Sequence, residues 1–121
     1  MKVLLVDDEA DIRRIAELSL KNLGGFEVLS AASGVEGLSM AEEHLPDVVL
    51  MDVTMPGLDG LDVLAELRRR EATAAMPVVF LTGRTQGRDR ERYAAAGAIG
   101  VIEKPFDPMT LSAELNRILG R

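Results

Sequence analysis

The chain contains no cysteine and no tryptophan, and it has only one tyrosine and one histidine. Without cysteine there are no disulfides, no thiolate catalysis and no cysteine-based zinc sites. The single histidine, His44, cannot build a histidine metal cluster by itself. Aromatic residues make up 3% of a chain that is 47% hydrophobic, so the core must be built from aliphatic side chains.

Positive charge is also in short supply. Fourteen Lys and Arg face twenty Asp and Glu, which leaves a formal net charge of -6. An acidic surface repels phosphate backbones, so direct binding to nucleic acid or to anionic membranes is disfavoured. No apolar run approaches the roughly 18–20 residues that a membrane span needs, and the first one, 3–6, lacks the features of a signal peptide. We expect one compact cytoplasmic domain covering residues 1–121.

Short apolar runs alternate with segments of helical periodicity. The runs predict strands at 3–6, 26–29, 47–51, 77–81 and 98–102. Helices are expected between them, and Asp107-Pro108 provides an N-cap and first residue for a last helix that runs to about Leu119. Five strands that alternate with five helices predict an α/β fold, with a parallel sheet and helices on both faces.

Chemically active side chains follow four of the predicted strands. Asp7 and Asp8 come after the first strand, Asp52 after the third, Thr82 after the fourth and Lys104 just beyond the fifth. In an open parallel sheet the ligand crevice lies beyond the carboxyl ends of the strands. The sequence therefore predicts three carboxylates, one hydroxyl and one ammonium group at the same edge.

This combination is typical of phosphoryl transfer. Three clustered carboxylates resist ionisation unless a cation joins them, and Mg²⁺ suits a small oxygen-lined site that admits phosphate. An ammonium and a hydroxyl group add charge neutralisation and positioning. A carboxylate nucleophile would form an aspartyl phosphate. A single Asp after a strand is more often a turn residue, so the hypothesis depends on the five occurring together.

Four motifs in order give the whole chain a family resemblance. They are Val6-Asp7-Asp8-Glu9, the D-x-x-M-P-x-x-D-G segment at 52–60, Leu81-Thr82-Gly83 and Glu103-Lys104-Pro105-Phe106. Together they resemble the receiver domain of bacterial two-component response regulators. The resemblance implies a flavodoxin-like (βα)5 fold with a five-stranded parallel sheet in the order 2-1-3-4-5.

The resemblance also implies a role for each site residue. Asp52 would accept a phosphoryl group from the phosphohistidine of a sensor histidine kinase, from a phosphotransfer protein, or from a small donor such as acetyl phosphate. Thr82 would swing toward that group and Lys104 would contact it. Such a domain is a signalling phosphoacceptor and not an enzyme, and it acts on a downstream protein or on an output domain outside this chain.

The implied metal is Mg²⁺. Asp8 and Asp52 would bind it directly, the backbone carbonyl of Thr54 would be a third ligand, and Asp7 would act mainly through a coordinated water. Receivers also tune the lifetime of the phosphoryl group through the residues two beyond the nucleophile and two beyond the threonine. Here these are Thr54 and Arg84, neither of which orients water well, so we expect slow autodephosphorylation.

One position departs from the family pattern. Receivers usually carry Tyr or Phe three residues before the lysine, and this chain has Val101. In receivers the ring turns inward and remodels the surface formed by the fourth helix, the fifth strand and the fifth helix. We expect the response to travel instead through the loop 82–87, whose glycines make rearrangement easier. An alternative is a receiver fold used for protein interaction with little phosphorylation-dependent output.

Two other classes of protein fit the sequence less well. A haloacid-dehalogenase-like phosphatase requires D-x-D at the nucleophile, whereas Thr54 stands two residues after Asp52. A flavodoxin-like electron carrier needs aromatic rings to stack on its flavin.

The arginines at 84, 88, 90 and 92 form either an exposed salt-bridged face or a docking surface. Those at 68–70 are expected to be a solvated helix end.

Overall fold

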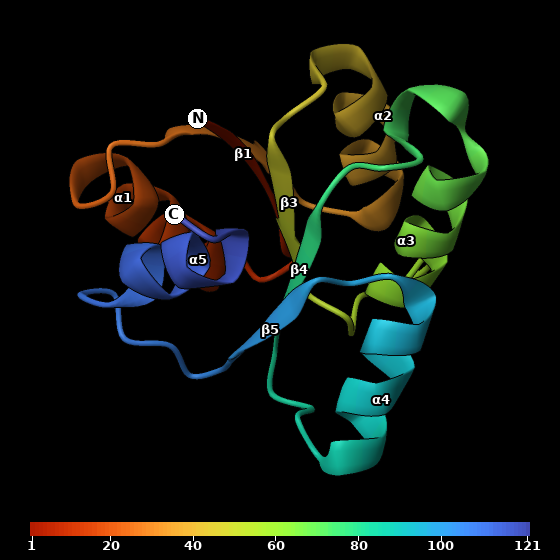
Figure 1. Cartoon of the computed structure of the whole chain (residues 1–121). Helices are drawn as coiled ribbons and strands as arrows, with labels where there is room; N and C mark the ends of the chain where they lie inside the picture. The colour runs from red at the N-terminus through yellow and green to blue at the C-terminus, as the bar shows by residue number, and fades with distance from the viewer.

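The computed structural model describes all residues from 1 to 121 and has an α/β architecture (Figure 1). Five parallel strands form one sheet in the order β2-β1-β3-β4-β5, as predicted. The strands are β1 (Lys2–Val6), β2 (Glu27–Ala31), β3 (Val48–Met51), β4 (Val78–Thr82) and β5 (Gly100–Glu103). The helices are α1 (Ala10–Asn22), α2 (Gly34–His44), α3 (Gly60–Arg69), α4 (Gly87–Ala96), α5 (Leu111–Leu119) and the short 3-10 helix η1 (Glu71–Thr73). None of the helices combines the length and apolar character required to cross a membrane.

The sheet separates two hydrophobic cores. Helices α1 and α5 cover one face, and α2, α3 and α4 cover the other (Figure 1). The three central strands are buried on both faces, as their continuous runs of Val, Leu and Met predict. Both cores are largely aliphatic; Phe80 and Tyr93 bring aromatic rings to the core beneath α2, α3 and α4.

The strand register sets the geometry of the sheet edge. Val6 of β1 pairs with Met51 of β3, so the next residues, Asp7 and Asp52, leave neighbouring strands side by side. On the other side of β3, Thr82 is the last residue of β4 and its carbonyl accepts a hydrogen bond from the Lys104 N–H at 2.9 Å. Strand pairing alone thus places the predicted site residues at one edge of the sheet, whatever contacts their side chains make.

The last helix begins later than predicted. It starts at Leu111, three residues after Pro108. Asp107 supports a turn instead: its side chain accepts a hydrogen bond from the Met109 N–H at 2.9 Å, and its carbonyl accepts from the N–H groups of Thr110 and Leu111 at 3.0 Å. The Asp-Pro signal for a helix start was therefore wrong by one turn, because the same side-chain acceptor serves a turn equally well.

Arg68 is not part of a solvated helix end. Its guanidinium donates hydrogen bonds to the carbonyl oxygens of Met76, at 2.8 Å, and Gly97, at 3.0 Å. Burial lowers the pKa of the Arg68 guanidinium. Arg68 thus joins the end of α3 to the segment before β4 and to the end of α4, whereas the side chain of Arg69 is exposed.

Candidate functional site

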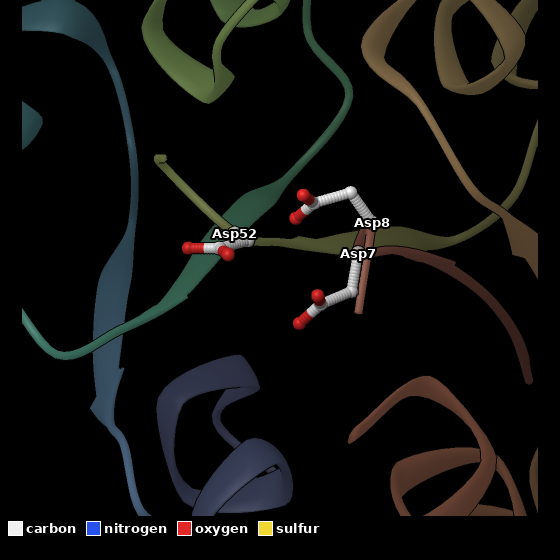
Figure 2. Close-up of side chains that lie close together, drawn as sticks. All are labelled: Asp7, Asp8 and Asp52. Atoms are coloured by element: carbon white, nitrogen blue, oxygen red, sulfur yellow. The ribbon is translucent and has the colours of Figure 1, made fainter. Parts of the chain in front are cut away.

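Three carboxylates meet at the carboxyl edge of the sheet. Asp7 follows β1 and is fully buried, Asp52 follows β3 and is 6% exposed, and Asp8 is exposed at the rim. Figure 2 shows the three side chains lying close together at the ends of these strands. One oxygen from each carboxylate lies within 4.8 Å of the others, so that a single ion could contact all three.

Lys104 brings a positive charge to the two buried carboxylates. Its Nζ lies 2.8 Å from Oδ2 of Asp7 and 3.2 Å from Oδ2 of Asp52. A weaker contact of 3.6 Å reaches the exposed Glu9. Because Lys104 directly follows the edge strand β5, its side chain spans the end of β4 to reach the residues after β1 and β3. The ammonium group therefore ties the ends of three strands together.

Backbone N–H groups fix the orientation of both buried carboxylates. The Glu9 N–H donates to Oδ1 of Asp7 at 2.9 Å, and the Thr54 N–H donates to Oδ1 of Asp52 at 3.2 Å. Behind Asp52, the absence of a side chain at Gly60 matters. A Cβ there would lie 2.4 Å from the Asp52 carbonyl oxygen, so only glycine allows the start of α3 to approach Asp52 this closely.

Charge in the pocket is out of balance. Burial raises the pKa of Asp52, against the opposing effect of the nearby Lys104 ammonium. Burial also works against the charge on Lys104, but the hydrogen bond and charge of Asp7, together with Asp52, outweigh it and raise the pKa of Lys104. Three carboxylates share one close ammonium group, and Asp8 makes no ion pair. The pocket keeps a negative potential that attracts a cation.

Thr82 completes the site from β4. Its side chain is buried, and its Oγ1 accepts a hydrogen bond from the Arg84 N–H at 3.2 Å. An open crevice of about 410 Å³ lies in front of these groups and is lined by Asp8, Glu9, Asp52, Thr54, Thr82, Gly83, Arg84 and Lys104. The loop that follows β3 and the loop that follows β4 thus line the same crevice.

The structure places all six predicted site residues at this edge, namely Asp7, Asp8, Asp52, Thr54, Thr82 and Lys104. Sequence reasoning missed Glu9 as a further partner of Lys104. It also missed Arg13, which donates a hydrogen bond to the Asp7 carbonyl at 2.8 Å. Glu9 belongs to the acidic motif and could have been found there, but nothing in the pattern of the first helix marks Arg13.

Fold and pocket define an α/β domain with a carboxylate-rich, lysine-bridged site at the edge of a parallel sheet. Residues 3–116 match the family described as "Response regulator receiver domain", and the chain belongs to this family. This confirms the family prediction. The domain is a phosphoacceptor of two-component signalling and not a conventional enzyme.

Similar curated proteins and solved structures agree with this family assignment. The chain is 41% identical over 120 residues to the probable transcriptional regulator ycf27 of Porphyridium aerugineum, covering 99% of this chain and 48% of that protein. It is 34% identical to the alkaline phosphatase synthesis transcriptional regulatory protein PhoP of Bacillus subtilis, covering 99% of this chain and 49% of that protein. The chemotaxis response regulator CheY4 of Vibrio cholerae superimposes with a TM-score of 0.90 at 36% identity, covering 97% of both chains. This chain thus spans about half the length of these two curated relatives.

Proposed function

We propose that Asp52 accepts a phosphoryl group from the phosphohistidine of a histidine kinase or of a phosphotransfer protein. A carboxylate oxygen of Asp52 forms the new bond to phosphorus, the bond from phosphorus to the histidine nitrogen breaks, and the imidazole keeps the electron pair of that bond. The supporting observation is the position of Asp52. It is the one carboxylate that both lines the open crevice and contacts Lys104 through a buried side chain.

The carboxylates fit a divalent cation. Their donor set consists only of oxygen, the ligand that Mg²⁺ prefers, and one ammonium group leaves their charge incompletely neutralised. We assign the ligands as Asp8, Asp52 and the Thr54 carbonyl, with Asp7 acting through water. Bound Mg²⁺ would supply positive charge next to the phosphoryl oxygens. Asp8 is free of ion pairs and sits at the rim, which makes it the most accessible ligand.

Thr82 and Lys104 act on the phosphoryl oxygens. Lys104 already lies 3.2 Å from Asp52, so it neutralises charge that the incoming group brings. Thr82 lines the same crevice, and its hydroxyl can donate a hydrogen bond to a phosphoryl oxygen once it turns toward Asp52. Lys104 is already held in place by its contacts with Asp7 and Asp52, whereas Thr82 has to turn before it can contact the phosphoryl group.

The effect of phosphorylation is recognised at a different surface of the domain. The curated relatives are named as transcriptional regulators and are about twice as long as this chain, whereas CheY4 is a chemotaxis protein covered almost completely. We propose that the modified domain changes the surface of α4, β5 and α5, and that a downstream protein or a linked output domain recognises this change. The acidic net charge argues against direct nucleic-acid binding by this domain.

Intact-mass measurement after incubation with acetyl phosphate and Mg²⁺ tests the assignment. We expect one phosphoryl adduct on the wild type and none on Asp52→Asn. Asp47→Asn is a matched control, since Asp47 lies just before the other end of β3 and an amide oxygen can still accept its hydrogen bond from the Lys2 N–H. A chelator should abolish the adduct. An adduct that survives Asp52→Asn would overturn the proposal.

The lifetime of the adduct is a second measurable property. Thr54 and Arg84 both line the crevice around Asp52, and neither offers a carboxylate or amide to orient an attacking water. We therefore expect slow autodephosphorylation. A phosphoryl half-life of seconds in the presence of Mg²⁺ would contradict this assignment of the two positions.

A further inference from the structure

Helix α4 depends on one buried side chain. Tyr93 is its only buried residue and is 1% exposed. By contrast, α1 and α5 each bury three residues, and α2 and α3 each bury four. The N-cap of α4, Gln86, makes no side-chain hydrogen bond that would stabilise the start of the helix. The attachment of α4 to the sheet therefore depends mainly on Tyr93.

Both ends of the Tyr93 side chain contact the strand and loop that carry Thr82. The ring packs edge-on against Phe80 of β4, with 5.0 Å between centroids, and Phe80 lies two residues before Thr82. The hydroxyl donates a hydrogen bond to the Arg84 carbonyl at 2.8 Å, two residues after Thr82. Tyr93 thus holds β4 and its following loop from within helix α4.

Two hydrogen bonds connect the phosphorylation site to this ring. Oγ1 of Thr82 accepts from the Arg84 N–H at 3.2 Å, and the Arg84 carbonyl accepts from Tyr93 at 2.8 Å. If Thr82 turns toward a phosphoryl group on Asp52, it gives up the first bond and releases the Arg84 backbone. The loop can follow the movement of Thr82, because Gly83 and Gly87 lie in open space: even a Cβ added at either position would have no neighbour within 4 Å.

We propose that Tyr93 is the positioning residue that holds the loop after β4 in its unphosphorylated arrangement and transmits the movement of Thr82 to helix α4. This rests on the proposed phosphorylation of Asp52. It identifies the connection between the site and the α4 surface in a chain that has Val101 on β5. Because the two equilibria are linked, anything that frees the Tyr93 hydroxyl from Arg84 must also favour phosphorylation.

The composition of the chain allows a direct spectroscopic test. Tyr93 is the only tyrosine and there is no tryptophan, so tyrosine emission reports on this side chain alone. We expect the emission of the wild type to change when acetyl phosphate and Mg²⁺ are added, and that of Asp52→Asn to stay constant. Intact mass on the same samples gives the extent of phosphorylation. Complete phosphorylation with unchanged emission would refute the role of Tyr93, whereas the absence of an adduct would refute the phosphorylation itself.

Tyr93→Phe separates positioning from packing, since it keeps the ring and removes only the hydroxyl. We expect roughly fivefold faster phosphorylation by acetyl phosphate, the equivalent of one neutral hydrogen bond, and loss of at least half of the phosphorylation-dependent change in amide exchange of α4. The matched control is Arg90→Met, which removes the exposed hydrogen bond from Arg90 to the Thr85 carbonyl and should leave both values unchanged. A purely structural Tyr93 would leave the exchange difference intact, and that result would overturn the proposal.

Discussion

The acidic pocket lies at the carboxyl edge of the sheet and helix α4 covers part of one face, and the two are held in different ways. Asp7, Asp52 and Lys104 are fixed by strand register, backbone N–H groups and two short ion pairs. Helix α4 has a single buried ring, one hydrogen bond from Arg68 to the Gly97 carbonyl at its end, and a preceding loop with two unobstructed glycines. The two regions therefore suit different tasks. The chemistry of the pocket needs fixed positions, whereas a structural response needs an element, such as α4, whose displacement requires little free energy.

The largest effect should come from removing the anchor of α4. We expect Tyr93→Ala to lower the free energy of unfolding by about 3–5 kcal/mol, because it leaves a cavity against Phe80 and deletes the bond to Arg84. Urea unfolding followed by circular dichroism measures the loss. A decrease below about 1 kcal/mol would mean that α4 has other anchors and would weaken the contrast with the pocket.

Lys104→Met should be nearly as damaging, on the other side of the comparison. It leaves Asp7 and Asp52 buried without their cation, which costs about 3 kcal/mol at neutral pH. The loss should shrink as the pH falls toward about 4, where carboxylates become protonated. At the alkaline end the difference between the wild type and the variant also shrinks, because the wild type then loses the stabilisation that its ammonium group provides. The folded pKa of Lys104 lies above 10.5, so its stabilisation is complete below that pH and disappears from the wild type, not the variant, at higher pH.

Gly60→Ala should disturb the pocket through the backbone. The new Cβ would lie 2.4 Å from the Asp52 carbonyl oxygen and 2.8 Å from the Val53 Cα, and neither atom can move without shifting Asp52. We expect a loss of about 2 kcal/mol and a clear fall in the rate of phosphorylation by acetyl phosphate. Unaltered kinetics in a folded variant would show that the position of Asp52 tolerates more movement than the strand register suggests.

Asp52→Asn should stabilise the protein at neutral pH. Burial raises the pKa of Asp52, so its contribution is most favourable below 3.8 and is lost as the pH rises through the folded pKa. The ionised carboxylate therefore lowers the stability of the folded protein at pH 7, and the neutral amide of Asn removes this destabilisation. Thermal unfolding at pH 7 and at pH 4 measures the effect, which should diminish at the lower pH. A variant less stable than the wild type at pH 7 would contradict this sign.

The smallest effect is expected at the start of α4. Gly87→Ala meets nothing within 4 Å and places a good helix former at the first helical residue. We expect a gain of about 0.5 kcal/mol and slower amide exchange in α4. The contrast with Gly60 is informative because the same substitution should destabilise the pocket side and stabilise the α4 side. A loss of stability at Gly87 would indicate a constraint on the loop.

The pocket was predictable from the sequence for a physical reason. Continuous apolar runs such as Val3–Val6 and Val48–Met51 define buried parallel strands, and parallel strands bring the residues that follow them to one edge. The strand order followed from the family resemblance, since alternation of strands and helices does not specify it. The late start of α5 was missed because Asp107 can support either a helix cap or a turn.

The side of α4 was much less predictable. Helical periodicity alone does not identify the buried side of a helix, as α1 shows: Ile15 and Leu18 fit its helical spacing and yet are 45% and 47% exposed. Tyr93 lies among arginines and alanines, in a segment whose pattern shows no inward face. Its burial depends on Phe80 and Arg84, which are 13 and 9 residues away, and only the fold brings them together.

Locating the phosphoryl group is the most direct test of the central claim. Cleavage at Lys21 and Arg68 gives one peptide, residues 22–68, that contains Asp52, and cleavage at Lys2 and Arg13 gives another that contains Asp7 and Asp8. After reaction with acetyl phosphate and Mg²⁺, borohydride reduction of the acyl phosphate and fragmentation of the peptides should place the mark at Asp52. A mark at Asp7, Asp8 or any other residue would contradict the account.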